Sequence, residues 1–168
     1  MNAAVLVARL YFGLGLAAHG AQKLFGWFGG YGIARTAGFM ESLGFRPGRA
    51  FALAAGLGET LAGLLVATGL FGAAGPALML LVMLVAAGSV HAKNGFFSMR
   101  NGVELPLLYG AAGMLLAFTG FGTLSLDRLL GLRILAGEPA AAIALVAAAA
   151  GALANLAARH APEHAAAS

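Results

Sequence analysis

Long apolar stretches, separated by short polar or glycine-rich connections, dominate the hydrophobicity pattern of this chain. A helix needs about 20 mostly apolar residues to cross a bilayer. Four stretches meet this length, and they cover residues 4–25, 50–71, 74–92 and 103–121. The pattern therefore predicts an all-α protein, an integral membrane bundle with four core transmembrane helices.

A fifth apolar stretch, residues 139–158, predicts a further helix near the C-terminus. It carries no charged residue, which favours insertion into the membrane, but it consists mostly of alanine, which contributes little to insertion. We expect it to span the membrane, and a helix that lies on the bundle or at the membrane surface is the alternative. The chain is thus divided into a four-helix membrane domain, residues 1–131, and an extension, residues 132–168, with this helix and a short polar tail.

The composition supports lipid as the surroundings of these helices. Of the 168 residues, 61% are hydrophobic and 10% are charged, whereas a soluble domain has about 25% charged residues. The net charge of +4 comes without a basic run, so we exclude a nucleic-acid partner. Cysteine is absent, which excludes disulfides, thiol redox chemistry and iron–sulfur ligation by this chain.

Basic residues in the connections and at the ends of the apolar stretches are concentrated on one side of the predicted bundle. The connections after the first and third helices lie on the same side, named side B here, and the opposite side is named side A. If the fifth stretch spans, side A holds only Arg128 and Arg133, and side B holds Lys23, Arg35, Arg46, Arg49, Lys93, Arg100 and Arg159. Cytoplasmic loops carry an excess of Lys and Arg. The chain is therefore predicted to lie in a bacterial-type cytoplasmic (inner) membrane, with side B inside and the N-terminus outside.

Ionisable side chains within the apolar stretches are costly, and they mark functional sites by default. Arg9 lies toward side A, where we expect it to extend its guanidinium to the lipid headgroups. The others lie toward side B, as judged from a rise of about 1.5 Å per residue. They predict a polar, ligand-binding pocket that opens toward side B and is lined by His19, Lys23, Glu59, His91, Lys93, Asn94 and Glu104. The alternative is a structural network of interhelical hydrogen bonds and ion pairs.

Aromatic residues follow the pocket candidates, at Trp27 and Phe28 and again at Phe96 and Phe97. They form either an interfacial aromatic belt or the walls around a ring-shaped ligand. A quinone headgroup would suit the second arrangement, because it needs a hydrogen-bond donor, an acid for proton exchange and aromatic walls. A haem would need paired axial histidines on facing helices, which the depths of the histidines do not favour. No tight ligand spacing predicts a metal site.

The pocket candidates form two similar series along the chain. His19 and Lys23 end the first helix, and His91 and Lys93 end the third. Each pair is followed by a loop rich in Gly and Phe, and then by a helix with one glutamate, Glu59 or Glu104. The pattern indicates either an internal repeat, as known from transporters, or a chance similarity of glycine-rich loops.

Several of these motifs together resemble the DoxX family. They are Arg9 with the run from His19-Gly-Ala-Gln-Lys23 to Gly30, Thr36-Ala-Gly-Phe39 with Leu43-Gly44, Glu59 ahead of Gly63, the run from His91 to Phe97 with Asn101-Gly102-Val-Glu104, and Ser125-Leu126-Asp127 near Gly131. The resemblance covers residues 5–131 and implies a four-helix membrane domain. Members of the family are described as oxidoreductases related to the small DoxD-type subunit of thiosulfate:quinone oxidoreductase, and most have no established reaction.

The resemblance implies a membrane subunit associated with quinone-linked oxidoreduction or with the response to thiol and oxidative stress. The cofactor stays unknown, with quinone as a candidate, and a soluble redox protein is a candidate partner, because no residue here is itself a redox centre. Two alternatives stay open, a carrier for a small or lipid-like metabolite and a scaffold for soluble redox enzymes. Small-residue stripes along the helices would also permit a homo-oligomer. The sequence names no catalytic residue.

Overall fold

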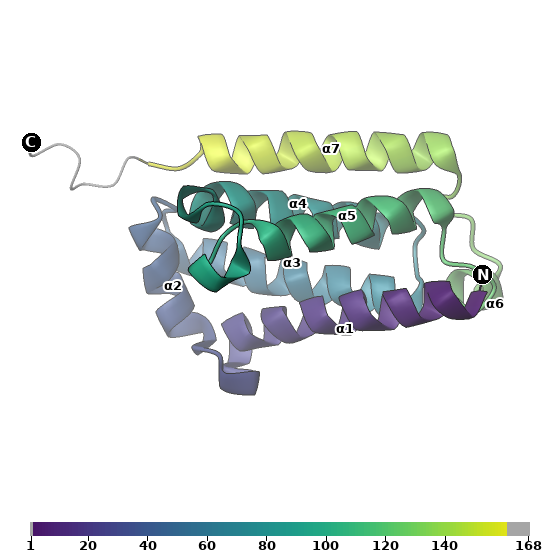
Figure 1. Ribbon diagram of the computed structural model, residues 1–168, viewed down its shortest axis with the longest axis horizontal. Coiled ribbons are helices and arrows are strands. Elements are labelled where there is room, and N and C mark those ends of the chain that lie inside the picture. Colours follow the sequence, from purple (N-terminus) through teal and green to yellow (C-terminus); the bar gives the residue numbers. More distant parts are fainter. Residues whose placement is uncertain (1, 161–168) are drawn as a thin grey trace, which may run out of the picture.

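The computed structural model describes residues 2–160, and all regular structure within them is helical (Figure 1). The helices are α1 (Asn2–Phe25), α2 (Gly32–Ser42), α3 (Gly48–Thr68), α4 (Ala74–Ala86), α5 (Glu104–Thr119), α6 (Leu126–Leu130) and α7 (Glu138–Ala157). A π-helical turn, Ala87–His91, and a 3-10 turn, Ala92–Asn94, continue α4. The predicted all-α membrane bundle is confirmed. The predicted polar tail lies, from residue 161 on, outside the described residues.

Four helical segments in the described part of the chain are long and apolar enough to cross a membrane. They are Asn2–Phe25, Gly48–Thr68, Ala74–Asn94 and Glu138–Ala157. The predicted fourth helix is shorter than expected, because α5 ends at Thr119 and Gly120 turns the chain away. Its 16 residues rise about 24 Å, less than the hydrocarbon thickness of about 30 Å.

Helix α7 runs along the whole length of the bundle, at the top of Figure 1. Just before it, the Leu135 carbonyl accepts a hydrogen bond from the Ala73 N–H at the α3–α4 turn, on side A. Just after it, on side B, the His160 N–H donates to the Gly44 carbonyl and the Arg159 guanidinium donates to the Leu43 carbonyl. Helix α7 is thus attached at both ends of the bundle, and it is long and apolar enough to cross a membrane.

The α1–α3 contact forms the centre of the bundle, where two backbones approach each other closely. A Cβ atom added to Gly13 would lie 2.6 Å from the Ala67 nitrogen, and one added to Gly63 would lie 2.5 Å from the Ala17 nitrogen. Small residues are used in this way where membrane helices must pack without a hydrophobic driving force. The buried apolar core lies beside this contact and includes Leu16, Ala62, Val66, Met79, Met83 and Leu116.

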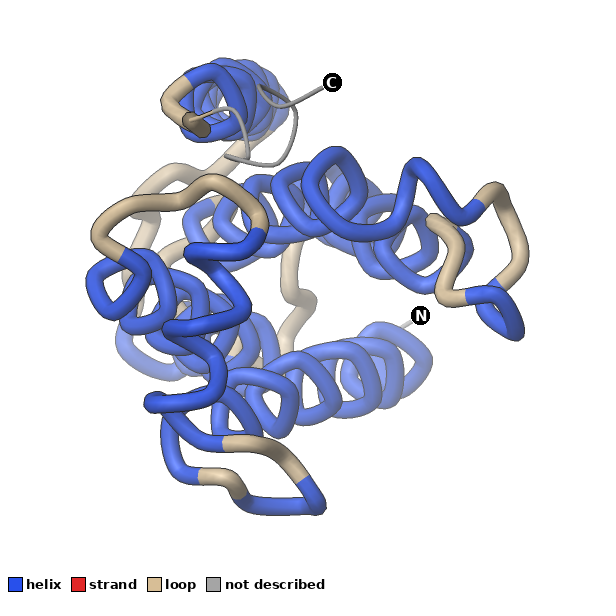
Figure 2. Tube along the Cα trace, turned by 90° about the vertical axis from the view of Figure 1, so that its left-hand side faces the viewer, coloured by secondary structure: helices blue, strands red, loops and turns tan. Residues whose placement is uncertain are grey.

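Helix α2 lies across the side-B end of the bundle, at the left of Figure 1 and facing the viewer in Figure 2. The sequence pattern predicted only a long loop here, because glycines interrupt the apolar periodicity of residues 26–47. The buried Thr36 fixes α2 to α1, since its hydroxyl donates to the Lys23 carbonyl at 3.3 Å. Side B is therefore covered by a helix and not only by loops.

Arg9 does not reach the lipid headgroups, so that expectation is wrong. Its side chain is 1% exposed, and it donates four hydrogen bonds of 2.7–3.0 Å to the carbonyls of Val66, Ala67, Phe121 and Leu124. The last carbonyls of a helix have no partner within the helix. The guanidinium satisfies two of them where α3 ends and thereby joins α1 to α3 and to the segment after α5.

Candidate ligand-binding cavity

A cavity of about 280 Å³ lies in the side-B half of the bundle, between α2, α3, α4 and the end of α7. Most of its lining is apolar and comes from α3 and α4. The polar side chains that line it are Lys23, Glu59, Ser89, His91 and Asn155. The cavity thus combines an apolar wall with a small number of polar groups, as ligand-binding sites commonly do.

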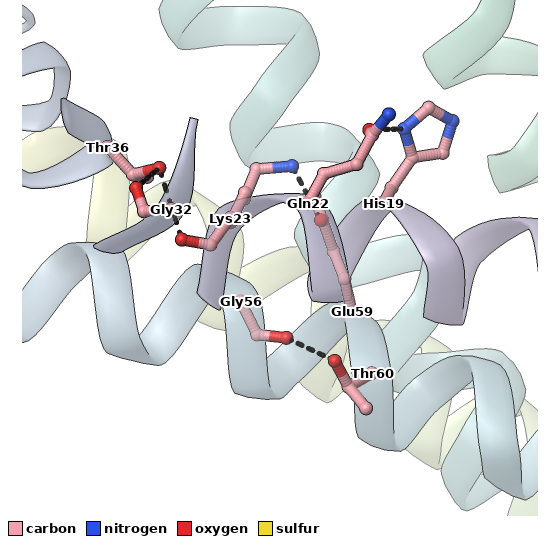
Figure 3. Close-up of polar contacts among 8 residues, drawn as sticks. All are labelled: His19, Gln22, Lys23, Gly32, Thr36, Gly56, Glu59 and Thr60. Carbon is pink, nitrogen blue, oxygen red and sulfur yellow. Dashed lines mark hydrogen bonds and ion pairs between the residues drawn. The ribbon is translucent and has the colours of Figure 1, made fainter. Parts of the chain in front are cut away.

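Lys23 and Glu59 form an ion pair at this cavity, with 2.5 Å between Nζ and Oε2. The side chain of Glu59, on α3, is 6% exposed, and that of Lys23, in the last turn of α1, is 29% exposed. Figure 3 shows the two groups facing each other from their helices. A charge buried in this way must be paired, and the two side chains supply that pairing to each other.

His91 lies at the end of the π-helical turn that continues α4. Ser89, Val90 and His91, three successive residues of this turn, all line the cavity. A π turn has i→i+5 hydrogen bonds and is rare compared with the α-helix. Such turns occur frequently at functional sites, and this one was not predictable from the apolar periodicity.

The His91 ring is oriented by the loop that follows it. Its Nδ1 lies 2.8 Å from the Asn101 carbonyl oxygen, and because a carbonyl only accepts, Nδ1 must be the donor. In the neutral ring, Nε2 is then an acceptor. His91 can therefore take up a proton at Nε2 and release it again while its position stays fixed.

The other residues predicted at the end of α1 do not line this cavity. His19 Nδ1 lies 3.0 Å from the Gln22 side-chain oxygen, and the Gln22 amide donates to the Phe28 carbonyl. Figure 3 shows His19 and Gln22 as a pair separate from Lys23 and Glu59. Trp27 and Phe28 are both more than half exposed, so the structure places them on the surface.

The α4–α5 loop holds the remaining predicted residues, and they shape the loop itself. The Asn94 amide donates to the carbonyls of Val90 and Asn101. Glu104 accepts a hydrogen bond from the Ser98 N–H at 2.8 Å. The exposed residues Lys93, Phe96 and Phe97 also lie outside the cavity lining. The structure thus brings together Lys23, Glu59 and His91 from the predicted set.

The aromatic part of the lining comes from residues that were not predicted, Phe39, Phe45 and Phe51. Phe45 and Phe51 pack with ring centroids 5.0 Å apart and their planes tilted by 36°, and the Arg159 guanidinium lies over the Phe45 ring, 5.5 Å from its centroid. These rings belong to α2, the α2–α3 loop and the start of α3. Their shared position depends on the packing of α2, which the sequence pattern did not reveal.

The family model named DoxX matches residues 4–92, more than half of the chain. The chain belongs to the DoxX family. The match contains α1 to α4 and with them Lys23, Glu59 and His91, whereas α5, α6 and α7 lie beyond it. No curated protein and no solved structure matches this DoxX chain.

The charged side chains that line the cavity of this DoxX protein have no net charge, and this limits the ligands that the cavity can bind. The positive charge of Lys23 is cancelled by Glu59, and Ser89 and Asn155 are uncharged. Lys23 can only donate hydrogen bonds, ionised Glu59 can only accept them, and His91 can exchange a proton. Within residues 2–160, no three His, Asp or Glu side chains are placed to hold a metal ion.

Proposed function

We propose that this DoxX protein is a membrane subunit of quinone-linked oxidoreduction and that it holds a quinone headgroup in the side-B cavity. The observation that carries the proposal is the composition of the cavity. An apolar, partly aromatic wall surrounds a donor at Lys23, an acceptor at Glu59 and a proton-exchanging group at His91.

The residues fit such a headgroup in size and in chemistry. Ligand sites commonly measure about 300–1,000 Å³, and a cavity of about 280 Å³ suits a single ring rather than a macrocycle. Lys23 would donate to a quinone carbonyl, Glu59 would accept from a quinol hydroxyl, and His91 would exchange the proton with side B. The bound quinone would supply the two-electron chemistry.

A soluble redox partner on side B completes the proposal, because the chain contains no group that carries electrons. The exposed basic residues of side B would meet an acidic surface on that partner, since complementary charges steer association. Such a partner would also connect the protein to thiol or oxidative stress.

Quinone binding to variants of the cavity tests this function. We expect Glu59→Gln, Lys23→Met and His91→Gln each to weaken the binding of a benzoquinone with one prenyl unit about 10-fold or more, the value of one hydrogen bond to a charged group. Binding would be measured by equilibrium titration in lipid nanodiscs. The double variant Lys23→Met/Glu59→Gln leaves no unpaired buried charge, and it separates loss of binding from loss of folding.

Those predicted residues that lie outside the cavity lining supply matched controls. Glu104→Gln, Lys93→Met and His19→Gln change the same residue types outside the cavity lining, and we expect them to bind the quinone as the unchanged protein does. Equal binding by all six single variants, or no binding by the unchanged protein, would contradict the proposed function.

A further inference from the structure

Helix α7 forms part of the cavity although it lies beyond the matched family segment. It packs against α4 and α5, and its buried face consists of Ala141, Leu145, Ala148 and Ala152. One turn beyond that face, Asn155 lines the cavity. The C-terminal extension therefore adds a wall to the site, and that wall contributes a polar group.

Asn155 is exceptional in its own helix. It is the one residue with a polar side chain between Glu138 and Arg159. A polar group in a membrane helix is expensive unless it is hydrogen-bonded, and other polar side chains in the spans of this protein have such bonds. The Thr60 hydroxyl, for example, donates to the Gly56 carbonyl, and the Ser89 hydroxyl donates to the Val85 carbonyl.

Within the described residues 2–160, the Asn155 side chain has no hydrogen-bond partner. Its amide therefore stabilises no other helix, unlike the interhelical polar contacts that hold membrane bundles together. It is partly buried and borders an apolar cavity. A polar group with this placement is explained by a hydrogen-bonding partner that enters the cavity.

We infer that Asn155 binds the uncharged polar head of the ligand and selects for it, an inference that rests on the proposed function. An amide both donates and accepts hydrogen bonds. Asn155 can therefore donate to a quinone carbonyl and, after rotation of the amide, accept from a quinol hydroxyl. Glu59, which only accepts, can serve the quinol alone, and Lys23 can only donate. Because the Lys23–Glu59 pair leaves the cavity without net charge, a neutral head fits better than an anionic one.

The variant Asn155→Leu tests this role, because leucine has a similar volume and no polar group. We expect about a 10-fold weaker affinity for both the oxidised and the reduced one-prenyl benzoquinone in nanodiscs. We also expect the ligand-free protein to unfold at the same temperature or a higher one, because the substitution breaks no bond within the protein. Thr119→Val is the matched control, since that hydroxyl bonds to the Leu115 carbonyl of its own helix and lies outside the lining.

The combination of weaker binding and unchanged or higher stability supports the inference, because a structural asparagine would show lower stability instead. Unchanged affinity of Asn155→Leu, beside weakened binding of Glu59→Gln, would overturn the role of Asn155 and leave the proposed function standing. A lower unfolding temperature of the ligand-free Asn155→Leu protein would likewise overturn it. If the unchanged protein binds neither form, the proposed function and this inference both fail.

Discussion

On side A, two charged side chains form hydrogen bonds to backbone groups at a helix end and in turns. Arg9 donates to carbonyls where α3 ends and after α5. Asp127 accepts from the N–H groups of Phe71 and Gly72 in the α3–α4 turn, at 2.8 and 2.7 Å. Each such group left unpaired in hydrocarbon costs several kcal/mol. These charges therefore have a structural role, in contrast to the charges that line the side-B cavity.

Replacing Arg9 should destabilise the bundle strongly. We expect Arg9→Leu to lower the free energy of unfolding by about 3 kcal/mol or more, because several buried carbonyls lose their donor. Arg9→Lys should recover only part of this loss, since one ammonium cannot replace a fork of donors. Arg133→Leu, at an exposed position, should change the stability by about 0.5 kcal/mol or less. Denaturant titration in detergent micelles measures all three, and equal stability of Arg9→Leu and Arg133→Leu would refute the structural role.

At the scale of elements, the distance between α1 and α3 determines whether Lys23 can reach Glu59. Glycines allow the two backbones to approach, at Gly13 and Gly20 on α1 and at Gly63 on α3. A Cβ atom at Gly20 would lie 2.6 Å from the Gly56 carbonyl oxygen. Because these neighbours are backbone atoms, they cannot move aside as a flexible side chain would. The ion pair of the cavity thus depends on residues that never contact a ligand.

Adding one methyl group at the α1–α3 contact should show whether the Lys23–Glu59 ion pair depends on this close approach. We expect Gly63→Ala to cost about 1–3 kcal/mol of unfolding free energy, as overpacking of a close contact does, and to weaken ligand binding by separating Lys23 from Glu59. Gly38→Ala in α2 meets no atom within 4 Å. It should leave the stability unchanged or raise it by up to about 1 kcal/mol. Thermal unfolding of the two variants compares them directly, and the opposite order of stability would contradict the packing argument.

At the scale of the whole molecule, the fifth helix determines which charges share a side. Because α7 crosses the bundle, Arg159 lies on side B and bonds to Leu43 there. Side B then has seven of the Lys and Arg residues, side A has Arg128 and Arg133, and Arg9 is buried. From this excess of positive charge we predict that side B faces the cytoplasm.

The absence of cysteine makes this orientation simple to measure. Single cysteines can be introduced at Ser42 on side B and at Thr123 on side A, both of which are exposed. In intact cells, we expect a membrane-impermeant maleimide to label Thr123→Cys and to leave Ser42→Cys unlabelled until the membrane is opened. The reverse pattern of labelling would mean that the protein is inserted with side B outside.

The candidate site was only partly predictable from the sequence. Glu59 was identifiable because a carboxylate within an apolar stretch is conspicuous, and the rise per residue gave its depth. Depth alone could not separate His91 from His19, because the direction of each side chain around its helix depends on the π turn and on the loop contacts. Asn155 was not identified, because one amide in an alanine-rich stretch carries no periodic signal.

The sequence by itself determined that lipid surrounds the helices, that the fold is helical, and approximately where the membrane helices end. These follow from the length and apolarity of single segments, which are local properties of the chain. Only the tertiary structure decided that Arg9 is buried, that α2 covers side B, and that Lys23, Glu59, His91 and Asn155 border one cavity. These features depend on how far apart helices lie and how each is rotated. Packing between segments distant in the sequence determines both quantities.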